Sequence, residues 1–359
     1  MWKEEIDLMW CQNMNNISQN AKNHWDNIAK PIDSLGLLED YVIKLCQISG
    51  SHKPYQLDKK ALVILCGDHG VVSEGVTQTG SEVTRIVSEN FAKGNSCVNQ
   101  MADVAGADVY TIDIGMLGEK YPDKDLRAGV VVDRKVDKGT KNLANEAAMS
   151  VQQCHAAIQV GIDLVEELKA MGYKIIATGE MGIGNTTPTS ALAAAFLDLS
   201  AYEVVGRGAG LSNDGMTRKF KVVGQAVARV RECDVTEPVE LLAQLGGYEL
   251  AGMVGLFLGG VKHQMPIVID GAISAVSAMV AGRIDSRVRD FALASHISGE
   301  ITGKLALDEL GLKAIIDGGL RLGEGSGAVA LFPLLDMAMA VYKNMGSFED
   351  YDIEAYERF

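Results

Sequence analysis

The chain has 359 residues, of which 47% are hydrophobic and 22% charged, so we expect a globular protein rather than a disordered one. A formal net charge of −14 argues against binding to nucleic acids and to anionic membranes, because both attract basic proteins. No apolar run is long enough to span a bilayer, the acidic N-terminus is unlike a secretion signal, and the six cysteines form no CxxC pair. These features predict a cytoplasmic protein with reduced thiols and without a structural zinc site.

The two ends of the chain predict helices. Residues 1–30 show a helical pattern with Trp2, Met9, Trp10 and Trp25 on mixed faces, and the apolar segment after residue 328 predicts another helix. Neither end has a predicted strand nearby, so the ends are expected to pack together. We therefore expect a small helical domain from residues 1–50 and 328–359, and a large α/β domain from residues 51–327.

Short apolar runs alternate with helical patterns through the middle of the chain. Such runs predict buried strands at residues 61–66, 107–114, 175–177 and 266–269, with an edge strand at 130–132. Strands separated by helices indicate a parallel sheet covered on both faces. The fold class expected is therefore α/β, a Rossmann-like parallel sheet flanked by helices.

A glycine-rich loop follows the strand at residues 175–177 and precedes a helix. This order presents free backbone N–H groups to an anion such as a phosphate. Gly182 and Gly184 allow close approach of the ligand, Asn185 and Thr186 add neutral donors, and Glu180 is expected to face another part of the ligand. An isolated loop of this kind is more often a turn without a ligand, so its function depends on the motifs that accompany it.

A second glycine-rich loop covers residues 206–214. Gly208 and Gly210 are candidates to bind phosphate, and Lys219 on the following helix supplies a positive charge suited to an anionic ligand. Lys219 is equally consistent with a solvated helix residue.

Polar residues follow other predicted strands. Asp68 and His69 come directly after the first strand, where ligands bind in open α/β sheets. The alternative is that Asp68 caps the loop and His69 is a packed polar residue, and for His69 the two interpretations are about equally supported. Ser295 lies in a segment dense in hydrogen-bond donors, and Glu324 is a single carboxylate between glycines.

Six stretches, in order along most of the chain, together resemble the nicotinate-nucleotide:dimethylbenzimidazole phosphoribosyltransferase family. They are GDHGV at 67–71, GEMGIGNTT at 179–187, GRGAG at 206–210, DG at 270–271, SH at 295–296 and LGEGSGA at 322–328. The resemblance implies a large α/β domain, a small helical domain from both chain ends, and a dimer with sites near the subunit interface. It also implies transfer of phosphoribose from nicotinate mononucleotide to an aromatic acceptor of cobamide biosynthesis, with release of nicotinate.

The resemblance also suggests roles for three residues. Glu324 matches the family's general base, and Glu180 and Lys219 match the acid and the lysine of the other two loops. Nicotinate mononucleotide is a substrate whose pyridinium departs as a neutral ring, so no metal or cofactor is expected. For a phenolic acceptor, His69 would assist Glu324.

The segment after GDHG departs from the family pattern. The family has an aromatic residue and a proline near the acceptor pocket, whereas residues 75–82 read Gly-Val-Thr-Gln-Thr-Gly-Ser-Glu. Some relatives activate phenols instead of benzimidazoles, and some of those work as paired unlike subunits. The acceptor is thus left open, as is the choice of homodimer or heterodimer, and Gln78, Ser81 and Met181 are candidates to line the acceptor slot by position alone.

Other functions are less consistent with the sequence. A nucleotide-binding subunit without chemistry of its own has no need of Glu324. A dehydrogenase lacks support because no glycine fingerprint with a later acid follows the first strand, and a P-loop NTPase lacks support because no GxxxxGK[ST] occurs.

Overall fold

The structure is a computed structural model that describes residues 2–358, with side chains from residue 14 onward. Contacts within the chain divide it into two compact units, Met1–Asp58 with Leu331–Phe359, and Lys59–Ala330. The expected boundaries, after residues 50 and 327, differ from this division: the linker up to Asp58 joins the unit of the chain ends, and residues 328–330 belong to the larger unit.

The unit of the chain ends is helical. It contains α1 (Trp2–Asn27), α2 (Leu37–Ser49), most of α14 (Ser326–Asn344) and a short 3₁₀ turn, η2 (Glu349–Tyr351). Trp25 is buried against Tyr342, whose hydroxyl donates a hydrogen bond of 2.8 Å to the carbonyl of His52. The side chains of Trp2, Met9 and Trp10 lie outside the described residues, so their predicted faces remain predictions.

Helix α14 corrects one expectation from the sequence. By length and composition it is apolar enough to cross a membrane, whereas no such run was expected. Of its most apolar window, 56% is buried in the structure, as in the core helix of a folded unit.

The larger unit is built on a six-stranded, wholly parallel sheet, which confirms the predicted fold class. The strand order is β3-β2-β1-β4-β5-β6. The strands are β1 (Lys60–Gly67), β2 (Ala107–Gly115), β3 (Val131–Asp133), β4 (Ile175–Met181), β5 (Ile267–Ile269) and β6 (Ala292–Ala294). Strand β6 was not predicted, because an Ala-Leu-Ala segment is too short to give a strand pattern.

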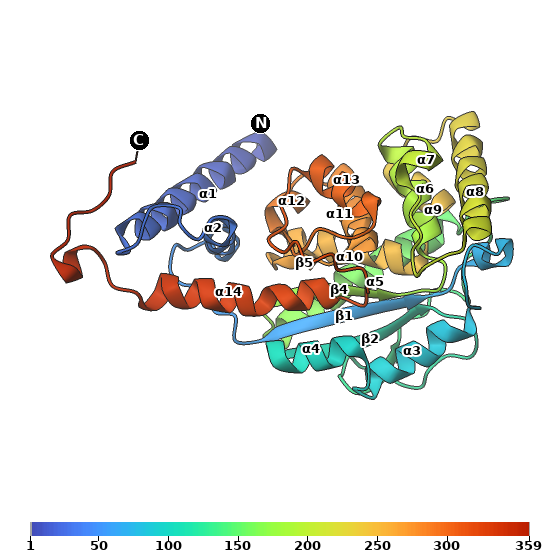
Figure 1. The fold of residues 1–359 in the computed structure, drawn as a ribbon, viewed down its shortest axis with the longest axis horizontal. Helices are drawn as coiled ribbons and strands as arrows, with labels where there is room; N and C mark the ends of the chain where they lie inside the picture. Colours follow the sequence, from blue (N-terminus) through green and yellow to red (C-terminus); the bar gives the residue numbers. More distant parts are fainter. Residues whose placement is uncertain (1, 359) are drawn as a thin grey trace. The chain divides into compact units, whose positions relative to one another are not determined.

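Helices cover both faces of this sheet (Figure 1), as parallel strands require. Helices α3 and α4 lie along β1 and β2, while α10 and α11 pack on the other face against β4 and β5. The helices of this unit are η1 (Gly70–Glu74), α3 (Glu82–Ala92), α4 (Cys97–Ala105), α5 (Val151–Ala170), α6 (Thr186–Phe196), α7 (Ala201–Val204), α8 (Asn213–Glu232), α9 (Pro238–Leu245), α10 (Tyr248–His263), α11 (Ala272–Ile284), α12 (Val288–Phe291), α13 (Ile301–Leu310) and the start of α14.

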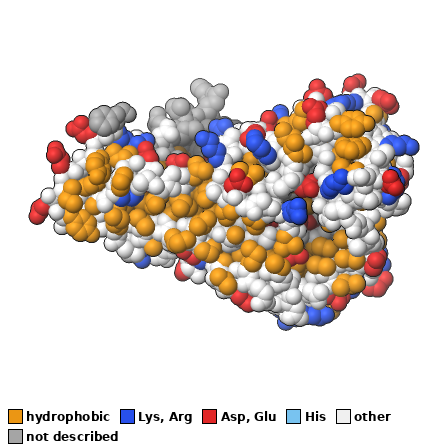
Figure 2. Space-filling view, in the orientation of Figure 1, with side chains coloured by type: hydrophobic (Ala, Val, Ile, Leu, Met, Phe, Trp, Pro, Cys, Tyr) orange, Lys and Arg blue, Asp and Glu red, His pale blue; other side chains and the backbone are white. Residues whose placement is uncertain are grey.

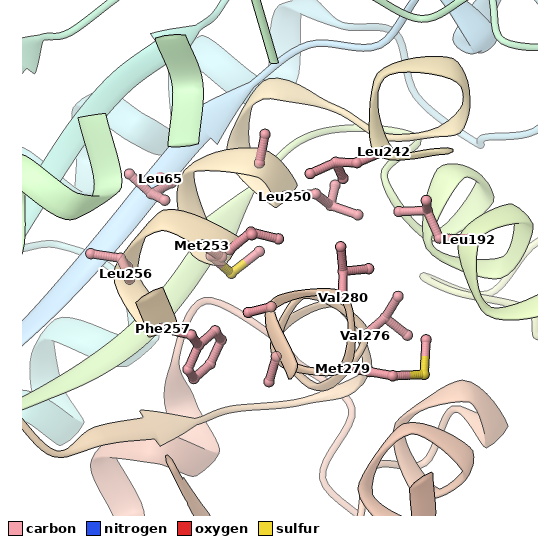
Figure 3. Close-up of a cluster of buried hydrophobic side chains, with 14 of the residues drawn as sticks. Leu65, Leu192, Leu242, Leu250, Met253, Leu256, Phe257, Val276, Met279 and Val280 are labelled. Atoms are coloured by element: carbon pink, nitrogen blue, oxygen red, sulfur yellow. The ribbon is translucent and has the colours of Figure 1, made fainter. Parts of the chain in front are cut away.

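The main core lies between the sheet and the helices α10 and α11. Figure 3 shows Leu65 of β1 beside α10 side chains such as Met253, with Val276 and Val280 of α11 facing them. Every residue of β1 is buried, which explains why its sequence is an almost unbroken apolar run rather than an alternating one.

The strand order fixes where a ligand can bind. From β1 the chain adds strands on one side of the sheet as far as β3, and then returns to add β4 to β6 on the other side, so β1 and β4 flank a topological switch point. At such a point the loops leave neighbouring strands on opposite sides of the sheet, and a crevice forms at the carboxyl ends of the strands. The same order occurs in dinucleotide-binding folds, so the fold alone does not identify the ligand. On the face in Figure 2, basic side chains are scattered among acidic ones, without one continuous basic patch.

Candidate active site

A cavity of about 310 Å³ opens at the carboxyl edge of the sheet. The segments after β1, β4, β5 and β6 line it, together with the loops around Gly208 and Gly323. The glycine loops that the sequence singled out, far apart along the chain, therefore meet at one site. Predicted site residues that line the cavity are Gln78, Glu180, Met181, Gly182, Gly184, Asn185, Thr186, Gly208 and Glu324.

Glu180 is the acid at the end of β4. Its Oε2 accepts a hydrogen bond from Asn185 Nδ2, and its Oε1 lies 3.4 Å from the backbone nitrogen of Glu324. Burial raises the pKa of Glu180 to about 7, and the carboxylates of Asp270 and Glu249 add to this rise, although the Asn185 hydrogen bond opposes it. Near neutral pH this side chain is therefore divided between its acid and carboxylate forms.

Glu324 occupies a backbone conformation that L residues seldom adopt. Its φ is +62°, between Gly323 at +84° and Gly325 at +94°. A Cβ added at Gly323 would lie 2.6 Å from Glu180 Oε1, so glycine is needed both for the conformation and for the close approach of this loop to the Glu180 carboxyl group.

The Glu324 side chain is half-buried and lines the cavity. Burial raises the pKa of Glu324, whereas a hydrogen bond from the backbone of Val98, at the start of α4, lowers it in part. Within the described part of the chain, its buried Oε2 has no hydrogen-bond partner. A carboxylate with a raised pKa and an uncommitted oxygen is suited to accept a proton.

Asp270 holds the Glu324 loop in place. Its carboxylate accepts hydrogen bonds from the backbone N–H groups of Gly325, Gly327 and Ala328, at 3.2, 2.8 and 3.1 Å, where α14 begins. The carboxylate thereby satisfies N–H groups that the first helical turn leaves unpaired. The acid at the end of β5 is thus an anchor for the loop that carries Glu324.

Lys219 lies behind the cavity wall rather than in it. Its ammonium donates to Thr186 Oγ1 at 2.8 Å and to the carbonyl of Gly206 at 3.1 Å, and the residue is only 1% exposed. Burial lowers the pKa of Lys219 to about 8, although the Glu300 carboxylate opposes this. The alternative of a solvated helix residue is therefore wrong, and the ammonium contacts Thr186, which lines the cavity.

In the second glycine loop, a carboxylate of the same chain already accepts the hydrogen bond that a phosphate was expected to accept. Glu300 Oε1 accepts a hydrogen bond of 2.9 Å from the N–H of Gly208, and a Cβ at Gly206 would overlap Glu300 Oε2. Gly210 has φ +95° and lies at the rim, where Gln78 Nε2 donates to its carbonyl. The Gly208 N–H is thus available to a phosphate only after Glu300 moves.

Asp68 and His69 lie outside this cavity. Asp68 Oδ2 accepts a hydrogen bond of 2.7 Å from the N–H of Leu117, and burial raises the pKa of Asp68. The ring of His69 is buried beneath Gly182, with Nε2 2.6 Å from Glu249 Oε1. Burial lowers the pKa of His69, but the carboxylates of Glu249, Asp68 and Glu180 together raise it, so the net shift is upward. Direct contact of these two side chains with substrate therefore has no support in the geometry.

Two other predicted residues are also displaced from the cavity. Ser81 precedes α3 and lines a separate hollow with Arg85 and Leu117. Ser295 is buried, and its hydroxyl donates to the carbonyl of Ile269 at 2.6 Å, so it supports the wall from behind.

Comparison with known proteins assigns the family. A family model described as "Phosphoribosyltransferase" matches residues 12–353. The nicotinate-nucleotide–dimethylbenzimidazole phosphoribosyltransferase of Acetivibrio thermocellus is 42% identical over 92% of each chain, and the protein of the same name from Geobacter sp. strain M21 is 40% identical over 90% of this chain and 91% of its own. The chain belongs to the nicotinate-nucleotide–dimethylbenzimidazole phosphoribosyltransferase family.

A solved structure supports the same assignment for this phosphoribosyltransferase. CobT from Thermus thermophilus superposes with a TM-score of 0.88 at 37% identity, covering 94% of this chain and 99% of that one. The chain is thus a pentosyltransferase, as the sequence indicated. The family decides against a dehydrogenase, despite the strand order that the two folds share.

The sequence interpretation missed several residues of the phosphoribosyltransferase site. Asp270 and His296 appeared only within the DG and SH stretches of the family resemblance. They were not proposed as site residues, and neither were Glu300 and Arg321, although all four line the cavity. Arg321 is exposed and directly precedes the LGEGSGA stretch, which is a signal that the sequence did contain. Glu300 gave no such signal, because its partner Gly208 lies far away along the chain.

Proposed function

We propose that this phosphoribosyltransferase moves the phosphoribosyl group of nicotinate mononucleotide to an aromatic base of cobamide biosynthesis. The names of its relatives support the donor and the class of acceptor. The observation that carries the proposal is Glu324, a half-buried residue that lines the cavity. Its backbone nitrogen lies 3.4 Å from Glu180 Oε1, and its side-chain Oε2 has no hydrogen-bond partner among the described residues.

The chemistry can be assigned bond by bond. The bond between C1 of the ribose and the pyridinium nitrogen breaks, and its electron pair stays on nicotinate, which leaves as a neutral ring. For a benzimidazole, the ring nitrogen that carries a free lone pair forms the new bond to C1 on the opposite face, giving an α-riboside phosphate. The proton on the other ring nitrogen passes to Glu324, which leaves the product ring neutral. Since the leaving group needs no protonation, the step needs no acid catalyst and no cofactor.

The neighbouring groups have supporting roles. A carboxylate near C1 stabilises an oxocarbenium-like transition state, and we assign this role to Glu180 in its ionised form. Positive charge from Lys219, transmitted through Thr186, and the glycines of the β4–α6 loop bind the 5′-phosphate. Fixing phosphate and ribose in this way is catalysis by positioning.

The acceptor is either dimethylbenzimidazole or a phenol. Residues Val76–Thr79 line the cavity, and the segment of residues 75–82 lacks the aromatic–proline pair of the family. With a phenol, Glu324 would take the O–H proton.

The base assignment is tested with Glu324→Gln, which keeps the side-chain volume but removes the proton acceptor. We expect transfer to fall by about 10²–10⁴-fold while nicotinate mononucleotide still binds, measured by nicotinate release and by calorimetry. Glu146→Gln, an exposed residue outside the cavity, is the matched control. Wild-type turnover by Glu324→Gln would refute the assignment.

The acceptor is tested by assaying the purified chain alone with a panel of benzimidazoles and phenols, with product mass as the readout. We expect a riboside phosphate from at least one class. No product from any acceptor would favour the alternative, a nucleotide-binding subunit that acts only with a paralogous partner.

A further inference from the structure

His296 is a cavity residue without an assigned role. It follows β6, and its backbone is fixed on both sides, because Ser295 donates to the carbonyl of Ile269 and Ile297 donates to the carbonyl of Ile316. A Cβ added at Gly327 would lie 1.9 Å from Nδ1 of the ring. The imidazole is thus held in one orientation by its own strand and by the start of α14.

The hydrogen bonds of Ser295 determine which nitrogen of the neutral His296 ring carries the proton. Ser295 Oγ lies 2.6 Å from the carbonyl oxygen of Ile269, which can only accept, so the hydroxyl proton points there. Nδ1 of His296 lies 3.0 Å from the same Oγ and must therefore be the donor. The neutral ring then carries its proton on Nδ1, which leaves a lone pair on Nε2.

Nε2 lies toward the side of the cavity formed by Gly271 and Ser298. A Cβ added at Gly271 would lie 3.8 Å from both Nε2 and Ser298 Oγ. The neighbouring carboxylates are already engaged, Asp270 by three N–H groups and Glu180 by Asn185 and the Glu324 backbone. A lone pair in this position suits a neutral hydroxyl donor and disfavours a phosphate oxygen, which also lacks a proton to donate.

We infer that Nε2 of His296 accepts a hydrogen bond from a ribose hydroxyl of the phosphoribosyl donor. This inference rests on the proposed function, which supplies a ribose with free 2′ and 3′ hydroxyls. The hydrogen bond fixes the rotation of the sugar, so that C1 faces the acceptor beside Glu324. His296 is therefore a substrate-binding residue of the ribose, separate from the groups that take the proton or hold the phosphate.

The inference is tested by removing the ribose hydroxyl and the His296 Nε2 separately and then together. The donors are nicotinate mononucleotide and its 2′-deoxy and 3′-deoxy analogues, and the proteins are wild type and His296→Phe, which keeps a ring but lacks Nε2. For one of the two hydroxyls, we expect its removal to lower kcat/KM or affinity by about 3- to 10-fold more in wild type than in His296→Phe. Intrinsic reactivity differences between the analogues cancel in this comparison.

Further variants separate binding from folding. His296→Gln, whose amide oxygen can accept a hydrogen bond, should recover part of the discrimination, and His155→Gln, an exposed histidine on α5, should behave as wild type. If His296→Phe does not fold, Ser295→Ala releases the Nδ1 proton and should weaken the same discrimination. In ¹⁵N spectra of the unliganded wild type, we expect the His296 proton on Nδ1.

Three outcomes would overturn the inference: equal discrimination in wild type and His296→Phe for both hydroxyls, a proton on Nε2 at neutral pH, or no effect of removing either hydroxyl in wild type. Failure of the proposed function would look different. Wild type would then release no nicotinate with any acceptor, while calorimetry with the three donors would still test the contact of His296.

Discussion

The two cavity carboxylates are held by opposite means. Glu180 extends from a regular strand and is fixed by Asn185, whereas Glu324 depends on a left-handed backbone that costs an L residue about 1–2 kcal/mol. Such strain persists only where the surroundings maintain it, and here Gly323, Gly325 and Asp270 do so. The site therefore keeps its base in a geometry that the local sequence alone would not favour.

Glu180 makes the stability of the unliganded protein depend on pH. Its folded-state pKa is about 7 against an ordinary value of 4.5, so between these values the folded state keeps a proton that the unfolded state releases. The free energy of unfolding therefore falls as the pH rises from 4.5 to about 7, by about 3 kcal/mol for a pKa shift of this size. Glu180→Gln should abolish that part of the decline, measured by urea unfolding from pH 4.5 to 7. An identical pH profile in both proteins would contradict the assignment.

Lys219 can be tested against a neighbour on the same helix. Lys219→Met removes a buried charge that contacts Thr186 and Gly206, so binding of nicotinate mononucleotide should weaken by about 10-fold or more. Lys221→Met, at an exposed position of α8, should leave affinity unchanged. Calorimetry measures both, and equal affinities would remove Lys219 from the site.

At the scale of elements, the start of helix α14 is held by a side chain that follows strand β5. Asp270→Ala leaves the N–H groups of Gly325, Gly327 and Ala328 without their acceptor in a buried place. We expect a loss of about 2 kcal/mol or more in unfolding free energy, together with a fall in turnover because the Glu324 loop loses its anchor.

A cap remote from the cavity is the control. Ser150→Ala removes the N-cap of α5, where Ser150 Oγ accepts from Gln153, and should cost about 1 kcal/mol with unchanged turnover. If Asp270→Ala lowered stability alone and not turnover, the anchoring role would be wrong.

Helices α5 and α10 approach so closely that their backbones touch. A Cβ at Gly161 would lie 2.0 Å from the carbonyl oxygen of Gly252, so Gly161→Ala must push the helices apart and should lower stability by about 1–3 kcal/mol. Gly224→Ala, inside α8 with nothing within 4 Å of the added Cβ, should instead stabilise by about 0.5–1 kcal/mol. Thermal unfolding of the two variants should therefore shift in opposite directions, and equal shifts would contradict the packing.

At the scale of the whole molecule, we propose a dimer, on the strength of the family resemblance. Light scattering of the purified 38.4 kDa chain should give twice that mass if it pairs with itself. A monomer that becomes active only when a paralogue is added would instead indicate a heterodimer. Because the chain carries a net charge of −14, the measurement should be made at physiological salt, which screens repulsion between copies.

Much of this protein could be predicted from its sequence because the causes are local. An apolar run such as that of β1 predicts a buried strand, and the runs together predicted the α/β class. The glycines around residues 182 and 323 predict loops with unusual backbone conformations, and these loops proved to be segments of the site. The family motifs added the roles of Glu180, Lys219 and Glu324, which remain to be tested.

Only the tertiary structure decided which buried polar groups are partners. Asp270 accepts hydrogen bonds from the backbone at the start of α14, and His69 pairs with Glu249 beneath a glycine. Glu300 accepts a hydrogen bond from the N–H of Gly208, and Ser295 determines which nitrogen of His296 carries the proton. All but the last of these pairs join residues far apart in the sequence. A buried polar group must find a partner, but which one it finds is set by the packing of strands and helices, and no local pattern records it.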